Sequence, residues 1–167
     1  TRADLVAREI PTYLGGGNPD TSIGIRLSLF RVAWAAFLEH PWAGWGFVTL
    51  PSAEALPATA SLWTDLMRVT FVNSGTHSEW LQHMMRMGLL GLLGRAALYL
   101  VPLALFARAA RQARGPARTA GYLGLVVVIG YLSASFTSEV SNLVYLSTFY
   151  GLMVAAFGAV ALRPAHP

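Results

Sequence analysis

The hydrophobic and polar positions of this chain divide it into a mixed first half and a strongly apolar second half. Residues 1–75 alternate short polar and apolar segments, too polar and too broken to span a bilayer. Three long apolar segments follow, at about 88–107, 119–136 and 143–162. At a helical rise of 1.5 Å per residue, residues 89–107 cover about 28 Å, close to the hydrocarbon thickness of a membrane. The pattern predicts an all-α, polytopic membrane protein fragment in which a helical loop region precedes three transmembrane helices.

Helix signals also occur within the polar half. Thr21 or Ser22 can cap a helix that Pro41 ends, and its apolar positions recur at roughly helical spacing. We expect this helix to lie on the membrane surface. The segment PWAGWGFVTLP (residues 41–51) predicts a tight turn whose tryptophans suit the headgroup layer. Weak helical content follows at 62–69, and amphipathic helix resumes at about Ser78. The division is therefore 1–86, with interfacial helices, and 87–167, with the three spans.

Composition supports a membrane protein and excludes several other classes. Hydrophobic residues make up 54% of the chain and charged residues only 12%, about half the share of a soluble domain. The absence of cysteine excludes disulfides and thiolate metal sites. The net charge of +4 does not indicate nucleic-acid binding, because the arginines do not gather on a soluble face.

The arginines instead predict the topology. The connection between the first two spans contains four of them, and the tail contains Arg163, whereas residues 137–142 contain none. By the positive-inside rule, the arginine loop and the C-terminus are cytoplasmic. Residues 1–75 and 137–142 then lie outside, in the periplasm. Because the chain starts with Thr1, we expect it to be the C-terminal part of a longer polytopic protein. The four loop arginines are Arg108, Arg111, Arg114 and Arg118.

Glycines mark the beginning of the first span. Gly88, Gly91 and Gly94 recur every three residues and so occupy one sector of a helix. Small residues in one sector allow another helix to approach closely. We therefore expect this span to pack inside a helix bundle.

The candidate chemistry lies outside the membrane. Arg26 is either an interfacial arginine that extends its head toward water or a binder of an anionic headgroup. His77 is either a neighbour of a helix cap or a general base with a near-neutral pKa. Glu79 is either a carboxylate that the helix dipole stabilises at the helix N-terminus, or a group that orients the His77 ring or contacts the substrate. Arg95, a charge within a span, either extends outward or binds pyrophosphate.

The sequence offers one more candidate cation and no metal site. Arg31 is a further external cation that we include among the substrate-binding candidates. His77 and His83 are six residues apart and lie on different helical faces, so no metal site and no cofactor are predicted.

Two blocks of sequence resemble a known family. GIRLSLFRVAWAAFLEHPWAGWGF resembles the periplasmic loop segment of the O-antigen ligase and polymerase superfamily, and THSEWLQHMMRMGLLGLL resembles its second block. Phe30 stands where that family usually has Trp, and Ser78 where it usually has Asn. The first block matches at Arg26, Phe30, Pro41, Gly44, Gly46 and Phe47, and the second at His77, Trp80, Leu81 and residues 88–93.

The resemblance implies a specific reaction. Such enzymes move a glycan from an undecaprenyl-pyrophosphate carrier to an acceptor hydroxyl outside the bacterial inner membrane. Arg26 would stabilise the departing pyrophosphate, and His77 would take the proton of the attacking hydroxyl, in an inverting, metal-independent displacement. The expected partners are this donor, a lipid A-core or other hydroxyl acceptor, and the lipid bilayer. Alternatives are an O-antigen polymerase, a protein O-oligosaccharyltransferase, or a non-catalytic transporter or scaffold subunit.

Overall fold

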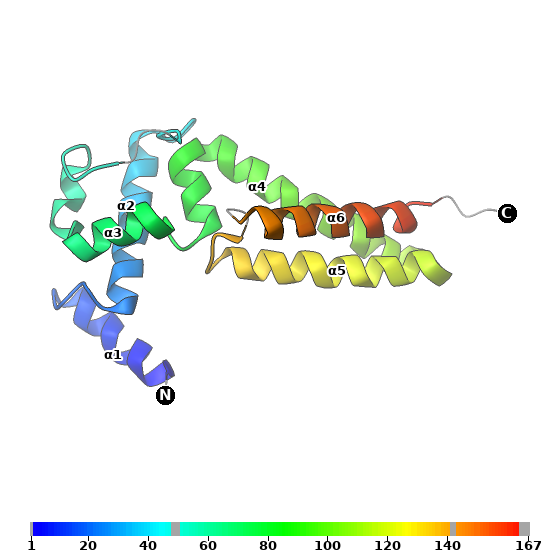
Figure 1. Cartoon of the computed structure of the whole chain (residues 1–167), viewed down its shortest axis with the longest axis horizontal. Helices are drawn as coiled ribbons and strands as arrows, with labels where there is room; N and C mark the ends of the chain where they lie inside the picture. The colour runs from blue at the N-terminus through cyan, green and yellow to red at the C-terminus, as the bar shows by residue number, and fades with distance from the viewer. Residues whose placement is uncertain (1, 48–50, 141–142, 164–167) are drawn as a thin grey trace. The chain divides into compact units, whose positions relative to one another are not determined.

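The computed structural model describes residues 2–47, 51–140 and 143–163, and all the regular structure in these residues is helical (Figure 1). Three parts of predicted segments lie outside the described residues, namely 48–50 of the turn, 141–142 of the external loop and 164–167 of the tail. The all-α prediction is confirmed. The elements are α1 (Arg2–Leu14), α2 (Ser22–Glu39), η1 (Pro57–Leu62), α3 (Asp65–Ser74), α4 (Glu79–Gln112), α5 (Gly115–Ser135) and α6 (Val144–Ala161).

The chain forms two compact units, Thr1–Leu92 and Leu93–Pro167, and each is described by itself. The predicted division between residues 86 and 87 follows membrane topology rather than compactness, so it stays a prediction.

The first unit is built around one face of α2. Thr21 caps this helix by accepting a hydrogen bond from the Gly24 amide at 3.0 Å, so the predicted start is confirmed. Its buried face, together with Met85 at the start of α4, forms a hydrophobic core with α3 and the segment before it. The core residues are Leu29, Val32, Ala33, Ala36, Leu56, Met67, Phe71 and Met85.

A turn after α2 inserts into a break in α4. The break is at Gly88, whose φ of 60° and ψ of −147° are not helical. In an unbroken helix the amides of Leu89 and Leu90 would donate to the carbonyls of Met85 and Arg86. Here the turn, residues 41–47, contributes a partner to each of these four groups. We call this arrangement the turn–helix junction.

The junction exchanges two helical hydrogen bonds for four bonds between segments. Leu89 donates to the Pro41 carbonyl at 2.7 Å and Leu90 to the Trp42 carbonyl at 3.4 Å. In the other direction, Met85 accepts from the Trp45 amide at 3.0 Å and Arg86 accepts from the Gly46 amide at 2.8 Å. These four backbone groups are therefore satisfied, as backbone shielded from water requires.

Two glycines permit this close approach. A Cβ at Gly88 would stand 2.6 Å from the carbonyl carbon of Trp42, and a Cβ at Gly44 would stand 2.3 Å from that of Arg86. Both glycines also have positive φ angles, 60° and 68°, which other residues adopt only at a cost. The expectation that Gly88 lets a second helix approach is therefore wrong. It breaks its own helix and admits a turn, while Gly94, with open space around it, is not approached closely.

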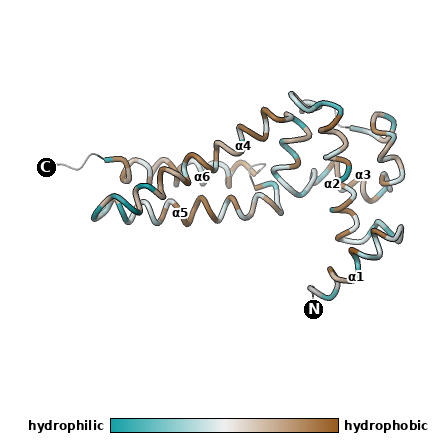
Figure 2. Tube along the Cα trace, turned by 180° about the vertical axis from the view of Figure 1, so that it is seen from behind, coloured by the Kyte–Doolittle hydropathy of each residue, from teal (hydrophilic) through white to brown (hydrophobic). Residues whose placement is uncertain are grey.

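The second unit contains α5, α6 and the part of α4 from Leu93 onward. Three helices, α4, α5 and α6, are long and apolar enough to cross a membrane, as predicted, and Figure 2 shows the hydrophobic residues along them. α4 is longer than the predicted span because it begins at Glu79. α5 and α6 lie side by side (Figure 1). The close helix approach does occur, but at Gly121 and Gly124 of α5, where a Cβ would meet α4 within 2.6 Å.

A tyrosine compensates for a proline within α4. Pro102 has no N–H, so the carbonyl of Leu98, four residues earlier, has no helical donor. The Tyr150 hydroxyl of α6 donates to this carbonyl at 2.8 Å. The Tyr150 ring also packs edge-on against Tyr99, with centroids 5.6 Å apart. Pro102 and Tyr150 therefore form a coupled pair that ties α6 to α4.

This coupling predicts a non-additive pair of substitutions. Tyr150→Phe keeps the ring and leaves the Leu98 carbonyl unsatisfied, so we expect a loss of about 1–2 kcal/mol of unfolding free energy. In a Pro102→Ala background the amide of residue 102 satisfies this carbonyl, and the same change should cost less than half as much. Denaturant unfolding in detergent micelles, followed by circular dichroism, measures both values. Tyr122→Phe, at a half-exposed position, is the control. Equal costs in both backgrounds would contradict the coupling.

Candidate functional site

Arg26 projects from one edge of the buried face of α2. It lies one turn beyond the Thr21 cap and is itself exposed. Leu29 and Ala33, on the adjacent positions of the helix, are fully buried in the core. The guanidinium is therefore anchored on a helix whose orientation the core fixes, while its charged end remains accessible to an anion.

His77 lies in the short connection between α3 and α4. Gly75 ends α3 and donates to the Phe71 carbonyl at 3.0 Å. His77 follows with a φ of 55°, the one non-glycine residue with positive φ among the described residues. An L-residue in this region costs about 1–2 kcal/mol, and such strain is often found at functional sites.

Neighbouring hydrogen bonds hold this strained conformation. The Thr76 hydroxyl, fully buried, donates to the Ser78 carbonyl at 2.8 Å. The backbone N–H of Gln82 donates to the same carbonyl at 2.9 Å, and this hydrogen bond is at the start of α4. The backbone on both sides of His77 is thus fixed, and the imidazole is half-buried. The predicted restart of the helix near Ser78 is confirmed.

Glu79 is buried, with 1% of its surface exposed. It is the acidic residue in the first turn of α4, where a carboxylate favours the helix dipole. Its depth shows that it is more than a solvated surface carboxylate. The backbone carbonyl of Glu79 lies 2.9 Å from Nδ1 of His83, so the His83 ring is turned back onto the first turn of its own helix.

Arg26 and His77 lie within electrostatic range of each other. Burial lowers the pKa of His77 below its usual value, and the positive charge of Arg26 lowers it further. The ring is therefore mainly neutral at pH 7, with an unprotonated nitrogen that can accept a proton. The structure thus brings together two side chains that lie far apart in the sequence.

The two remaining predicted arginines occupy other surroundings. Arg31 is about 140° from Arg26 around α2, at the opposite edge of the buried face. Its guanidinium lies over the Tyr13 ring of α1, 5.5 Å from the centroid. Arg95 belongs to the second unit, where it is 8% exposed and 6.0 Å from the Tyr99 ring centroid. A cavity of about 270 Å³ adjoins Arg95, Tyr99, Tyr131 and Tyr150.

Sequence reasoning missed the residue that fastens the turn to α4. Arg86 donates from Nη1 to the Phe47 carbonyl at 3.1 Å and lies over the Phe47 ring at 5.4 Å. With the Gln82 amide oxygen turned toward it, Arg86 also donates from Nε at 2.8 Å. The two glycine-containing blocks were visible in the sequence, but nothing in either block indicates that they bind each other.

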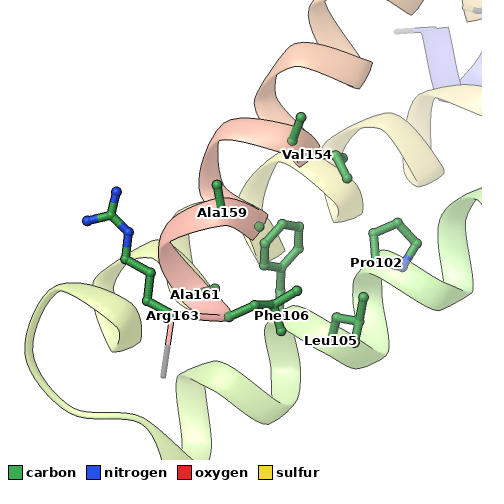
Figure 3. A pocket seen from close by; sticks show the side chains of 10 residues that line it. Pro102, Leu105, Phe106, Val154, Ala159, Ala161 and Arg163 are labelled. Atoms are coloured by element: carbon green, nitrogen blue, oxygen red, sulfur yellow. The ribbon is translucent and has the colours of Figure 1, made fainter. Parts of the chain in front are cut away.

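A larger cavity, of about 630 Å³, lies in the second unit and is almost wholly apolar (Figure 3). Figure 3 shows the Arg163 guanidinium turned away from its lining. Arg163 is the one charged residue among those that line it. Within the described ranges, no group of three His, Asp or Glu converges in a way that could hold a metal ion. The apolar residues that line the cavity of Figure 3 include Pro102, Leu105, Phe106, Val154, Ala159 and Ala161.

Comparison with known proteins gives one match. Residues 2–96, more than half of the chain, match the model of a family described as O-antigen ligase. The match contains α1, α2, α3, the turn–helix junction and both Arg26 and His77. No curated protein matches the chain.

The electrostatic pairing predicts how the titration of His77 responds to substitution. Arg26→Gln removes a positive charge, so the pKa of His77 should rise, yet stay below its usual value because burial remains. Arg31→Gln, on the other edge of α2, should leave it unchanged. Chemical shifts of isotope-labelled histidine, assigned with His77→Gln, report the pKa. An identical pKa in wild type and Arg26→Gln would contradict the pairing.

Proposed function

Because the chain belongs to the O-antigen ligase family, whose general activity is glycan transfer of the ligase or polymerase type, we propose that it transfers a glycan from an undecaprenyl-pyrophosphate carrier to a lipid A-core hydroxyl. One observation carries the proposal: Arg26 lies close enough to His77 to lower its pKa. A fixed cation beside a neutral imidazole suits a reaction with an anionic leaving group and a hydroxyl nucleophile.

His77 acts as the general base. A neutral imidazole accepts the proton of the acceptor hydroxyl as its oxygen attacks the anomeric carbon. The hydrogen bonds at Ser78 and the φ of His77 hold the backbone in one conformation, which reduces the reorganisation needed at the moment of reaction.

Arg26 stabilises the leaving group. The bond between the anomeric carbon and the phosphate oxygen breaks as the acceptor oxygen forms its own bond, and the electron pair leaves with the pyrophosphate. A guanidinium can bind two phosphate oxygens at once and remains charged at every relevant pH. A single displacement of this kind inverts the anomeric configuration and requires no metal ion or cofactor.

Substrate binding also tunes the base. While the donor is absent, burial and, to a smaller extent, the Arg26 charge both lower the pKa of His77. A bound pyrophosphate offsets that charge, so the pKa of His77 rises in the complex and its affinity for the acceptor proton increases. Arg26 thus couples arrival of the donor to the strength of the base.

Three further residues are assigned to substrate binding. Glu79 orients the imidazole or accepts a hydrogen bond from the acceptor sugar. Arg31 contacts the donor glycan or its phosphates from the other edge of α2. Arg95 binds an anionic group at the external end of the first span.

The proposed setting is the bacterial inner membrane. The chain crosses the bilayer several times, with the site on the periplasmic side and the C-terminus in the cytoplasm, as the arginine distribution indicates. Family membership favours an enzyme over a transporter or scaffold subunit. A polymerase and a protein O-oligosaccharyltransferase share the same donor chemistry, so the acceptor distinguishes them.

Substitution of either residue should abolish transfer without unfolding the protein. His77→Ala should lower kcat by about 100- to 10,000-fold, and Arg26→Ala by about 100- to 1,000-fold. His77→Gly should have the same effect with equal or higher thermal stability, since glycine tolerates positive φ. Purified full-length protein in micelles, supplied with lipid-linked glycan and each class of acceptor, provides the assay.

The same assay contains its controls. Arg68→Ala removes an exposed cation that lies over Trp63 and should leave kcat unchanged. EDTA should have no effect, and inhibition by EDTA would contradict the metal-free mechanism. Full transfer by both His77→Ala and Arg26→Ala would exclude the proposed roles.

The coupling between donor and base predicts two different pH profiles. The acid limb of kcat/KM reports His77 in the free enzyme, and the acid limb of kcat reports it in the complex. The apparent pKa should therefore be below the usual histidine value in kcat/KM and higher in kcat. Initial rates between pH 4.5 and 8, at limiting and saturating donor, measure both limbs. Coincident limbs would show that the pyrophosphate does not reach Arg26.

A further inference from the structure

The turn–helix junction lies between the two elements that carry the proposed catalytic pair. We infer that it acts as a positioning device: Gly44 and Gly88 keep the turn docked in the break of α4, and this docking sets His77 against Arg26. The inference rests on the proposed function for the roles of those two side chains. Neither glycine contacts substrate, so both are positioning residues.

The turn is also attached to the end of α2. The indole Nε1 of Trp45 donates to the Ala36 carbonyl near the end of α2 at 2.8 Å. The His40 ring, at the C-cap of α2, packs edge-on against Trp45 with centroids 5.0 Å apart. A displacement of the turn therefore changes the relation between α2, which carries Arg26, and the segment of α4 that follows His77.

The segment between His77 and the break is short and rigid. It runs from Glu79 to Met87 as α-helix, and its Met85 is fully buried in the core that α2 and α3 share. Arg86 adds a second attachment to the turn through Phe47. Because the segment is one helix, a displacement of its far end, where the turn holds Met85 and Arg86, is passed along it to His77.

An unbroken α4 is the competing state. Leu89 and Leu90 could then pair with Met85 and Arg86 within the helix, and the groups of the exposed turn could bind water. The break therefore persists only while the turn is docked, which requires glycine at residues 44 and 88. Alanine at position 88 favours the unbroken state, because it promotes helix, disfavours a φ of 60° and meets the backbone of Trp42.

The test compares two glycine substitutions in the same helix of the full-length protein. Gly88→Ala should lower kcat by about 100-fold with a smaller change in KM, because the base is misplaced while the donor still binds. It should also move the acid limb of kcat/KM toward the usual histidine pKa, as His77 separates from Arg26. Gly94→Ala, where a Cβ meets nothing within 4 Å, should leave both quantities unchanged.

Amide hydrogen exchange tests whether the turn is docked on α4 without an activity assay. In Gly88→Ala the amides of Trp45 and Gly46 should exchange faster, because their acceptors on α4 have moved. Residues 29–36, in the core of the first unit, should keep their protection. Retained protection at residues 45 and 46 would overturn the inference, and so would wild-type kcat in Gly88→Ala.

A milder pair of variants keeps the inference testable if Gly88→Ala fails to fold. Trp45→Phe keeps an aromatic ring but removes the bond to Ala36, so kcat should fall about 5-fold. Trp42→Phe, at an exposed side chain of the same turn, should retain wild-type kcat. Equal activity in these two variants would overturn the inference. Loss of transfer in His77→Gly with normal transfer in Gly88→Ala would reject the positioning role alone and leave the proposed function intact.

Discussion

The first unit depends on one constraint, which is that a helix broken at Gly88 must find new partners for four backbone groups. Unsatisfied backbone groups cost several kcal/mol where water is excluded, so a buried break without compensation would not persist. The turn of residues 41–47 supplies the four partners in a reciprocal pattern. The attachment of the turn to α4, and with it the link between the end of α2 and the helical segment that follows His77, depends on this exchange.

The second unit solves a related problem by a different route. Pro102 removes one amide, and a single side-chain hydroxyl, that of Tyr150, replaces it. A side chain can satisfy one released carbonyl while the helix continues in the same direction. A backbone segment is needed where two consecutive hydrogen bonds are lost and the helix changes direction, as at Gly88. The two compensations therefore differ in kind, with one side-chain hydroxyl at Pro102 and a backbone turn at Gly88.

The sequence was sufficient to predict the features that depend on local pattern. Hydropathy located the three apolar helices, and Thr21 and Ser78 marked helix starts, because capping and periodicity act within a few residues. Gly88 could not be read in the same way. Glycines three residues apart suit both a close helix contact and a helix break, and what decides between them is a turn some forty residues earlier. The helical conformation of α1 and of residues 57–62 was not predicted.

The same limit applies to the candidate site. The chemistry of Arg26 and His77 indicated what each could do, and the family resemblance paired them. The effect of the Arg26 charge on the pKa of His77 depends on tertiary packing that no periodicity encodes. The strain at His77 was equally invisible, since positive φ at a non-glycine residue leaves no compositional trace. Among the described residues it is the packing of Thr76 and Gln82 around one carbonyl that maintains it.

The three residues of the candidate site differ in solvent exposure. Arg26 is exposed, His77 is half-buried, and Glu79 is almost fully buried. An anionic group can therefore reach the guanidinium from outside without crossing the core, whereas the imidazole retains the partial desolvation that lowers its pKa. A more exposed histidine would be protonated more readily and would lose strength as a base below neutral pH. A more deeply buried one would be inaccessible to a hydroxyl, so an intermediate depth suits the proton transfer that we propose for His77.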